Sequence, residues 1–144
     1  MQVKDIMNTD VKTISPASTA QDAAKEMNKY GIGGLIVVDR DRMAGIVTER
    51  DIMRHVVAAG KDPKKVKTKE IMVKRVIMID PEADISEAAE IMQQNGIKKL
   101  PVLHKSSLVG IITATDIVAA QPKMIQDLSE LFAMGKKKSQ IVAG

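Results

Sequence analysis

The most constraining feature of this 144-residue chain is an internal repeat at a spacing of 65 residues. The phrase GIVTERDI at residues 45–52 returns as GIITATDI at residues 110–117, and residues 5–7 match residues 70–72 without a gap. Most matching positions are apolar or Gly. A repeat this regular predicts one structural unit built twice. Two copies are few for a solenoid, so we expect a pseudo-twofold pair that shares one core.

Each copy predicts the same order of elements, strand–helix–strand–strand–helix. Short β-prone runs at residues 11–15 and 75–80 are each followed closely by a Pro. Thr19 and Asp84 are expected to cap the next helices, with acids three residues further on at Asp22 and Glu87. The remaining elements expected are strands at 35–38, 44–47, 100–103 and 109–112, and second helices that open at Thr48 and Thr113.

Composition excludes several classes of protein. Hydrophobic residues make up 44% of the chain and aromatic residues 1%, so the core must be aliphatic. The absence of Cys excludes disulfides, thiolate metal sites and a Cys nucleophile. The only histidines, His55 and His104, are a poor basis for a zinc site, and no nucleophile–base–acid set is present. No run approaches the roughly 18 apolar residues of a membrane span, and the charged start argues against a signal peptide, so we expect a cytoplasmic protein.

The phrase pairs GIGGLIVVD…GIVTERDI and GIKKLPVLH…GIITATDI resemble the CBS domain, named after cystathionine β-synthase. The resemblance covers about residues 1–120, and a tandem pair of such domains is called a Bateman module. It implies an α+β fold in which two β-α-β-β-α units pack sheet to sheet with pseudo-twofold symmetry. We place the first CBS unit at 1–62, the second at 63–121, and a C-terminal helix with a basic tail at 122–144.

The resemblance also implies a ligand. Many CBS pairs bind adenosyl compounds in two clefts, so we expect a non-catalytic regulatory module that binds AMP, ADP or ATP, with NAD or S-adenosylmethionine as further options. No cofactor is required and no catalytic residue is expected. By resemblance, such modules pair as homodimers through helix faces and act on an effector protein, which is here unknown. Two alternatives remain open: an adaptor that binds nucleic acid through its basic segments, and an accessory subunit of an IMP dehydrogenase-like enzyme.

The Thr-x-x-Asp motif at the start of each second helix has two interpretations. Thr48 and Thr113 can be N-caps that Asp51 and Asp116 complete as capping boxes. The same geometry exposes free backbone N–H groups, and a fixed carboxylate can accept both hydroxyls of a ribose. In the family that the chain resembles, these two positions hold the ribose. The interpretations are compatible, because a capping residue can also bind a ligand.

The other candidate residues surround these motifs. Ile14 and Leu35 in one half, and Ile79 and Leu100 in the other, are expected either to wall an adenine slot or to pack in the core. Lys98 and Lys99 stand where relatives contact phosphate, or they are solvated; we expect their site to be the tighter for phosphate. The full set of expected nucleotide-binding residues is Thr13, Ile14, Gly34, Leu35, Thr48, Arg50, Asp51, Met78, Ile79, Lys98, Lys99, Leu100, Pro101, Thr113, Thr115 and Asp116.

Overall fold

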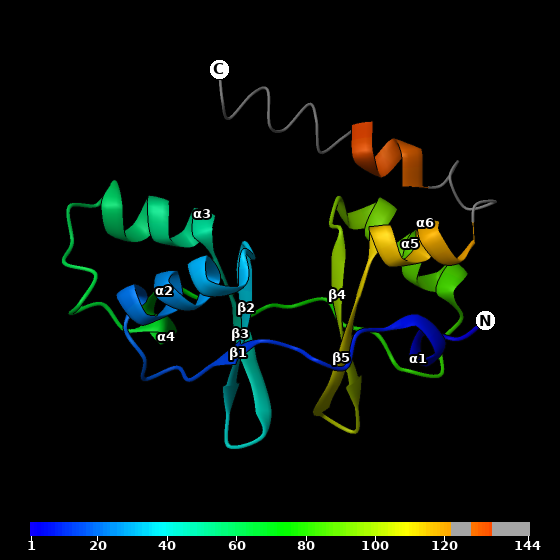
Figure 1. Cartoon of the computed structure of the whole chain (residues 1–144), viewed down its shortest axis with the longest axis horizontal. Coiled ribbons are helices and arrows are strands. Elements are labelled where there is room, and N and C mark those ends of the chain that lie inside the picture. Colours follow the sequence, from blue (N-terminus) through cyan, green and yellow to red (C-terminus); the bar gives the residue numbers. More distant parts are fainter. Residues whose placement is uncertain (122–127, 134–144) are drawn as a thin grey trace. The chain divides into compact units, whose positions relative to one another are not determined.

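The computed structural model describes residues 1–121 and 128–133 of the chain (Figure 1). The fold is α+β, as the sequence predicts, and the chain divides into two compact units. We call Val11–Val76 the central unit. The terminal unit consists of Met1–Asp10 together with the chain from Ile77 onward.

The central unit is a three-stranded sheet with its helices on one face (Figure 1). Strand β1 runs parallel to β2, and β2 pairs with β3 as an antiparallel hairpin. Its elements are β1 (Thr13–Ile14), α2 (Ala20–Tyr30), β2 (Gly34–Asp39), β3 (Arg42–Thr48), α3 (Glu49–Ile52), the π-helical turn η1 (Met53–Val57) and α4 (Thr68–Ile71).

The terminal unit repeats this plan. Strands β4 and β5 form an antiparallel hairpin, and a single parallel bridge between Ile79 and Val102 stands where β1 pairs with β2 in the central unit. Its elements are α1 (Val3–Ile6), α5 (Ile85–Asn95), β4 (Lys99–His104), β5 (Ser107–Thr113) and α6 (Ala114–Ala120). Residues 128–133 are also helical.

Each unit has its own aliphatic core. In the central unit Leu35, Val37 and Val47 of the sheet pack against Ala23 and Met27 of α2. The terminal core is built from matching positions and gains two leucines from the C-terminal helix, Leu128 and Leu131, both fully buried. The expected C-terminal helix is therefore seen at residues 128–133, while residues 122–127 and the basic tail lie outside the described residues.

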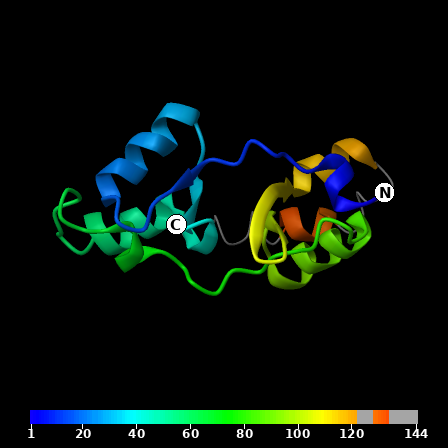
Figure 2. The same ribbon diagram turned by 90° about the horizontal axis from the view of Figure 1, so that it is seen from below.

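The two copies of the repeat exchange their first segments, residues 1–10 and the equivalent residues 66–75, which we call the arms. Asn8 bridges Ile111 of β5, and at the equivalent positions Val73 bridges Ile46 of β3. Helix α1 therefore lies beside α6 although it starts the chain (Figures 1 and 2). The expected division at residue 62 follows the repeat in sequence; the packing units differ from it because these arms hydrogen-bond to the other repeat.

The helix ends follow the local sequence. Thr19 and Asp22 form the expected capping box of α2. At α5 the expected cap Asp84 is present, but its carboxylate accepts the amide and hydroxyl of Ser86 instead of pairing with Glu87. Gly31 and Gly96 end the two helices in the left-handed conformation, which Gly adopts at no steric cost. Among the described helices, none has the length and apolar character needed to cross a membrane.

Candidate nucleotide-binding site

Strand register sorts the candidate residues of the central unit onto two faces of its sheet. Thr13 pairs with Ile36, and Gly34 pairs with Thr48. Since directly opposed residues point to the same face and neighbours along a strand alternate, Thr13, Gly34 and Thr48 share one face. The opposite face carries Ile14 and Leu35, which lie in the core. The structure therefore places Gly34 and Thr48 directly opposite each other at the end of β3, while Thr13 lies on the same face of the sheet, two strands away on β1.

The terminal unit separates its residues in the same way. Lys99 stands directly opposite Thr113 in the β4–β5 register, so an expected phosphate contact lies next to an expected ribose contact. Pro101 follows two residues along and points to the same face as Lys99. Met78 is 45% exposed, whereas its neighbour Ile79 is buried in the core.

The expected apolar walls of the adenine slot are core residues in both units. Leu35 is 1% exposed and Leu100 is completely buried, and both belong to the hydrophobic clusters beneath the helices. Ile14 and Ile79 are similarly buried. These burials correspond to the packing role that the sequence left open as the alternative.

The Thr-x-x-Asp motifs form capping boxes in both units. In α3 the Asp51 Oδ2 accepts the Thr48 amide at 2.8 Å, and the Asp51 amide donates to the Thr48 hydroxyl at 3.3 Å. In α6 the corresponding distances for Thr113 and Asp116 are 2.9 and 3.1 Å. Both boxes use the Oδ2 atom, so a carboxylate can keep its cap and still offer Oδ1 to another group. The aspartates are half-buried, which leaves them accessible from outside.

A hollow of about 330 Å³ lies beside Asp51. It combines acidic groups, Asp51 and Glu70, with the basic side chains of His55 and Lys61. Its apolar wall comes from the exchanged arm, through Ile71, Met72 and Val73. A small pocket with a few converging polar groups on an apolar wall is typical of a ligand site.

Three more of the expected nucleotide-binding residues are exposed on the surface. Arg50 of α3 and Thr115 of α6 are exposed, as is Lys98 just before β4. The Lys98 ammonium lies 5.5 Å from the centre of the Phe132 ring, a cation–π contact within the terminal unit. The backbone carbonyl of Lys98 accepts the Ala114 amide at 2.9 Å, and this hydrogen bond joins the start of β4 to the start of α6.

The sequence left Glu70 and Lys61, which line the hollow, without a role at the site. For Glu70 a signal was present, because residues 70–72 match residues 5–7 in the repeat. What the repeat does not reveal is that each arm crosses to the other copy. The Ile46–Val73 bridge attaches the arm to β3, and this attachment places Met72 and Val73 beside Asp51 at the start of α3.

Within residues 1–121 and 128–133, no three His, Cys, Asp or Glu side chains are grouped as metal ligands. His104 is exposed as the last residue of β4. The basic run at Lys136–Lys138 lies outside the described residues.

The family model of the CBS domain matches the chain twice, at residues 3–58 and 69–123. The chain therefore belongs to the CBS domain family and carries a tandem pair, as the sequence analysis expected. Pairs of this kind are typically regulatory modules. Hypoxic response protein 1 of Mycobacterium tuberculosis is 35% identical over 121 residues, which cover 83% of this chain and 85% of that protein.

Solved structures share the fold over nearly the whole chain. A conserved CBS domain protein from Thermoplasma acidophilum superposes with a TM-score of 0.81 at 27% identity, covering 94% of this chain and 76% of its own. A hexameric CBS-CP12 protein from bloom-forming cyanobacteria superposes with a TM-score of 0.70 at 34% identity, covering 100% and 88%.

An enzyme also contains a related segment. Inosine-5'-monophosphate dehydrogenase of Thermoplasma acidophilum is 41% identical over 117 residues, but the match covers 81% of this chain and only 23% of the enzyme. The similarity is therefore to the enzyme's CBS region. It gives no catalytic residues to this chain.

Proposed function

We propose that this protein is a non-catalytic regulatory module that binds an adenine nucleotide of the AMP, ADP or ATP class. The observation that carries the proposal is the hollow beside Asp51, the residue to which the family resemblance assigns the ribose. Lys61 lines the same hollow and provides positive charge for a phosphate, and His55 adds an imidazole that can hydrogen-bond to it. Asp51 would hold the ribose hydroxyls while keeping its cap on α3.

The exchanged arms supply the route from binding to regulation. Glu70, Met72 and Val73 of one arm line the hollow together with Asp51. A nucleotide that contacts both would stabilise the arm on β3 and so change the population of states in which the arm is docked. Ligands act on such equilibria only through different affinities for the two states.

The two copies are proposed to be unequal sites. The terminal unit places Lys99 opposite Thr113, whereas the central unit has Gly34 opposite Thr48. Lysine near the ribose-binding end favours a charged nucleotide there. The proposal therefore keeps the terminal site as the tighter for phosphate, with Lys99 as the main contact because Lys98 lies over Phe132.

A thermal-shift panel tests the nucleotide proposal. The full chain is heated with AMP, ADP, ATP, NAD or S-adenosylmethionine, each with a matched 2'-deoxy or 3'-deoxy analogue where one exists. A true ligand at 100-fold its Kd stabilises the folded state by about 2.7 kcal/mol. The deoxy analogues should give a smaller shift, because they lack half of the diol that the aspartate accepts.

Two results would refute the proposal. One is a panel in which no adenosyl compound raises Tm. The other is an equal shift with the deoxy analogues, which would mean that neither aspartate holds a ribose. Isothermal titration of Lys99→Ala separately tests the inequality: loss of the tighter site is expected, and two unchanged sites would contradict it.

Quaternary structure belongs to the same proposal. We expect a homodimer, and the hexameric cyanobacterial relative is one precedent for assembly within the family. Sedimentation of the full chain with and without AMP would measure the state directly. A monomer under both conditions would remove oligomerisation from the mechanism.

A second candidate function is that of an accessory subunit for a nucleotide-metabolising enzyme. The observation that favours it is the 41% identity to the CBS region of inosine-5'-monophosphate dehydrogenase. Titrating the full chain onto such an enzyme from the same cell, with activity as the readout, tests this role. No change in rate and no co-sedimentation would exclude it.

A further inference from the structure

The C-terminal helix at residues 128–133 docks on the terminal unit through two apolar anchors and exposed polar contacts. Leu128 and Leu131 are fully buried in the terminal core. At the edge of the helix, the Gln93 side-chain amide donates to the Glu130 carboxylate. A short segment held in this way belongs to the low end of local stability. A modest change in its contacts therefore alters how often it is docked.

Lys98 provides a further contact to this helix. Its ammonium lies 5.5 Å from the centre of the Phe132 ring, within the range of a cation–π interaction. Lys98 is exposed and Phe132 is 41% exposed, so water weakens the contact. Hydrogen bonds between an ammonium and a phosphate are among the strong ones in proteins, because both groups are charged. A phosphate that reaches the Lys98 ammonium would therefore attract it more strongly than the ring does.

The backbone of Lys98 is held beside the candidate ribose site of the terminal unit. Its carbonyl accepts the Ala114 amide at 2.9 Å, at the start of α6. Its neighbour Lys99 stands directly opposite Thr113, the N-cap of α6. Lys98 precedes β4, so its side chain, a flexible four-carbon stem, is not fixed to one face of the sheet. From this position the ammonium can turn toward the ring or toward a phosphate beside Lys99, but it cannot bind both in full.

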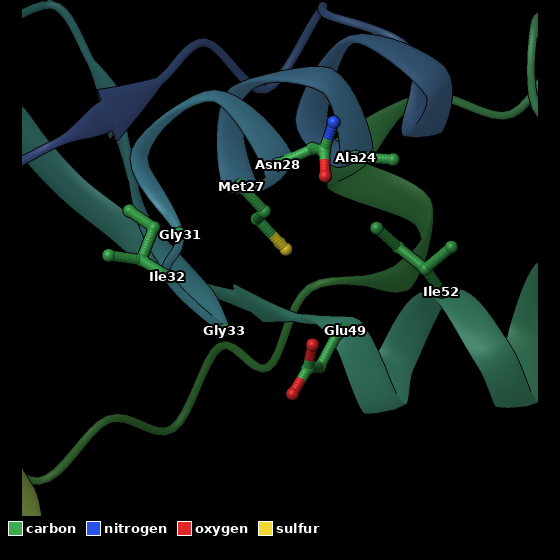
Figure 3. A pocket seen from close by; sticks show the side chains of 8 residues that line it. All are labelled: Ala24, Met27, Asn28, Gly31, Ile32, Gly33, Glu49 and Ile52. Carbon is green, nitrogen blue, oxygen red and sulfur yellow. The ribbon is translucent and has the colours of Figure 1, made fainter.

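The central unit has the same backbone hydrogen bond but neither the lysine nor the ring. The Gly33 carbonyl accepts the Glu49 amide at 3.0 Å. Gly33 has no side chain, and both residues line a hollow of about 480 Å³ (Figure 3). The Glu49 Oε1 lies 3.0 Å from where a Cβ on Gly33 would be, so the nearby charge is negative. The position equivalent to Phe132 is Lys67, the N-cap of α4. The lysine and the ring therefore occur together, in the copy that carries the C-terminal helix.

We propose that the C-terminal helix and the phosphate of a nucleotide bound in the terminal unit compete for Lys98, an inference that rests on the proposed function. With the helix docked, Lys98 lies over Phe132 and Lys99 contacts the phosphate alone. A nucleotide that draws Lys98 from the ring weakens docking, and by linkage a docked helix weakens phosphate binding by the same factor. The helix is thus an autoinhibitory element for this site, and its release exposes Leu128 and Leu131.

Phe132→Trp gives a direct report of helix docking. The chain contains no Trp, and Trp is the best aromatic partner for a cation, so this variant keeps the contact and adds a single fluorophore. The full chain is titrated with adenosine, AMP and ATP; fluorescence anisotropy follows the helix, and isothermal titration measures binding. AMP and ATP should lower the anisotropy, because a released helix moves faster. Adenosine lacks a phosphate and should leave it unchanged. In Lys98→Met, which lacks the charge, AMP and ATP should bind without lowering the anisotropy.

The reciprocal effect is measured on nucleotide affinity. Phe132→Leu keeps an apolar side chain without the ring, and should tighten ATP binding about two- to fivefold, the size of an exposed cation–π contact. Affinity for adenosine should not change. In the Lys98→Met background the same substitution should have no effect on ATP. Tyr30→Leu is the matched control, because the Tyr30 ring lies under Lys12 and Lys29 in the central unit.

The outcomes separate this inference from the proposed function. No binding heat with any of the three compounds would refute both. Binding of AMP and ATP that leaves the anisotropy of Phe132→Trp unchanged, or that Phe132→Leu does not tighten, would overturn the competition and leave the nucleotide site in place. An equal fall in anisotropy in the Lys98→Met background would also overturn it, since the helix would then respond through another group. Circular dichroism melts confirm that each variant is folded.

Discussion

Asp51 Oδ2 accepts two hydrogen bonds from Thr48, one from its amide at 2.8 Å and one from its hydroxyl at 3.0 Å. The carboxylate is thereby held in one orientation at the start of α3. A side chain fixed in this way loses little further freedom when a ligand binds, and such preorganisation favours affinity. The capping role and the proposed ligand role of Asp51 therefore support each other.

Replacing this aspartate should have two separable effects. Asp51→Ala is expected to lower the free energy of unfolding by about 1 kcal/mol or less, since it removes an acidic residue from a helix N-terminus. It should in addition abolish nucleotide stabilisation of the central unit. Urea titration with and without AMP measures both effects, and Asp116→Ala gives the matched comparison for the other site. Full nucleotide stabilisation in the double variant would contradict the assignment.

Two glycines let the exchanged arms approach the sheets. A Cβ on Gly45 would lie 2.5 Å from the Val73 carbonyl oxygen, which is backbone and cannot move aside without breaking the Ile46–Val73 bridge. We expect Gly45→Ala to destabilise the protein by about 1–3 kcal/mol, the usual cost of overpacking. At Gly110 the nearest atom is the Met7 sulfur at 2.7 Å, with backbone slightly further away at 3.0 Å.

The two variants and a control can be ranked in one experiment. Because a methionine side chain is flexible, Gly110→Ala should cost less than Gly45→Ala. Gly34→Ala is the control, since its Cβ would meet only ordinary contacts at 3.5 Å. Thermal denaturation of the three variants gives the order. Equal stability of Gly45→Ala and Gly34→Ala would show that the arm does not dock as described.

Local order was predictable from the sequence because short-range chemistry dictates it. The expected caps at Thr19 and Thr48 are present. Each depends on residues within one turn of helix. The 65-residue repeat then transferred the predicted order of elements from one copy to the other.

The exchange of the arms was beyond the reach of pattern reading. Val3 and Thr68 are equivalent in the repeat and are both completely buried, yet each packs in a unit made largely of the other copy. Thr68 donates its amide and hydroxyl to the Ser18 carbonyl at 2.7 and 2.9 Å. These contacts join residues 50 positions apart, and no local pattern specifies them. The lining of the Asp51 hollow was missed for the same reason.

Acid should destabilise the protein partly through Asp22. The Thr19 amide donates to this exposed carboxylate at 2.9 Å and lowers its pKa below the usual value. A carboxyl with a lower pKa in the folded state stabilises the fold above the unfolded-state pKa of about 3.9, and this stabilisation is lost as the pH falls through the folded-state value. Asp22→Asn should therefore be less stable than the parent at pH 7 and approach it near pH 2.

Urea midpoints measured between pH 7 and pH 2 test this pH dependence. Asp84 provides a second example, because the Ser86 amide lowers its pKa in the same direction. The two Asn variants should show the same convergence. A stability difference that stays constant across the whole pH range would mean that ionisation of these caps contributes nothing.

The tips of the two hairpins offer a route to a more stable protein. Arg40 and Asp41 have φ values of 50° and 65°, and Lys105 and Ser106 repeat them with 49° and 70°. Non-glycine residues are strained in this left-handed region, and two-residue hairpin turns of this kind favour Gly at the second central position. Asp41→Gly and Ser106→Gly should each raise the free energy of unfolding by about 0.5–1 kcal/mol, since relief of strain exceeds the added entropy of the unfolded chain. Their effects should add, because the turns belong to different units, and urea denaturation of the single and double variants checks both the sign and the sum. Lower stability in either variant would mean that the Asp41 or Ser106 side chain stabilises its turn by more than the strain costs.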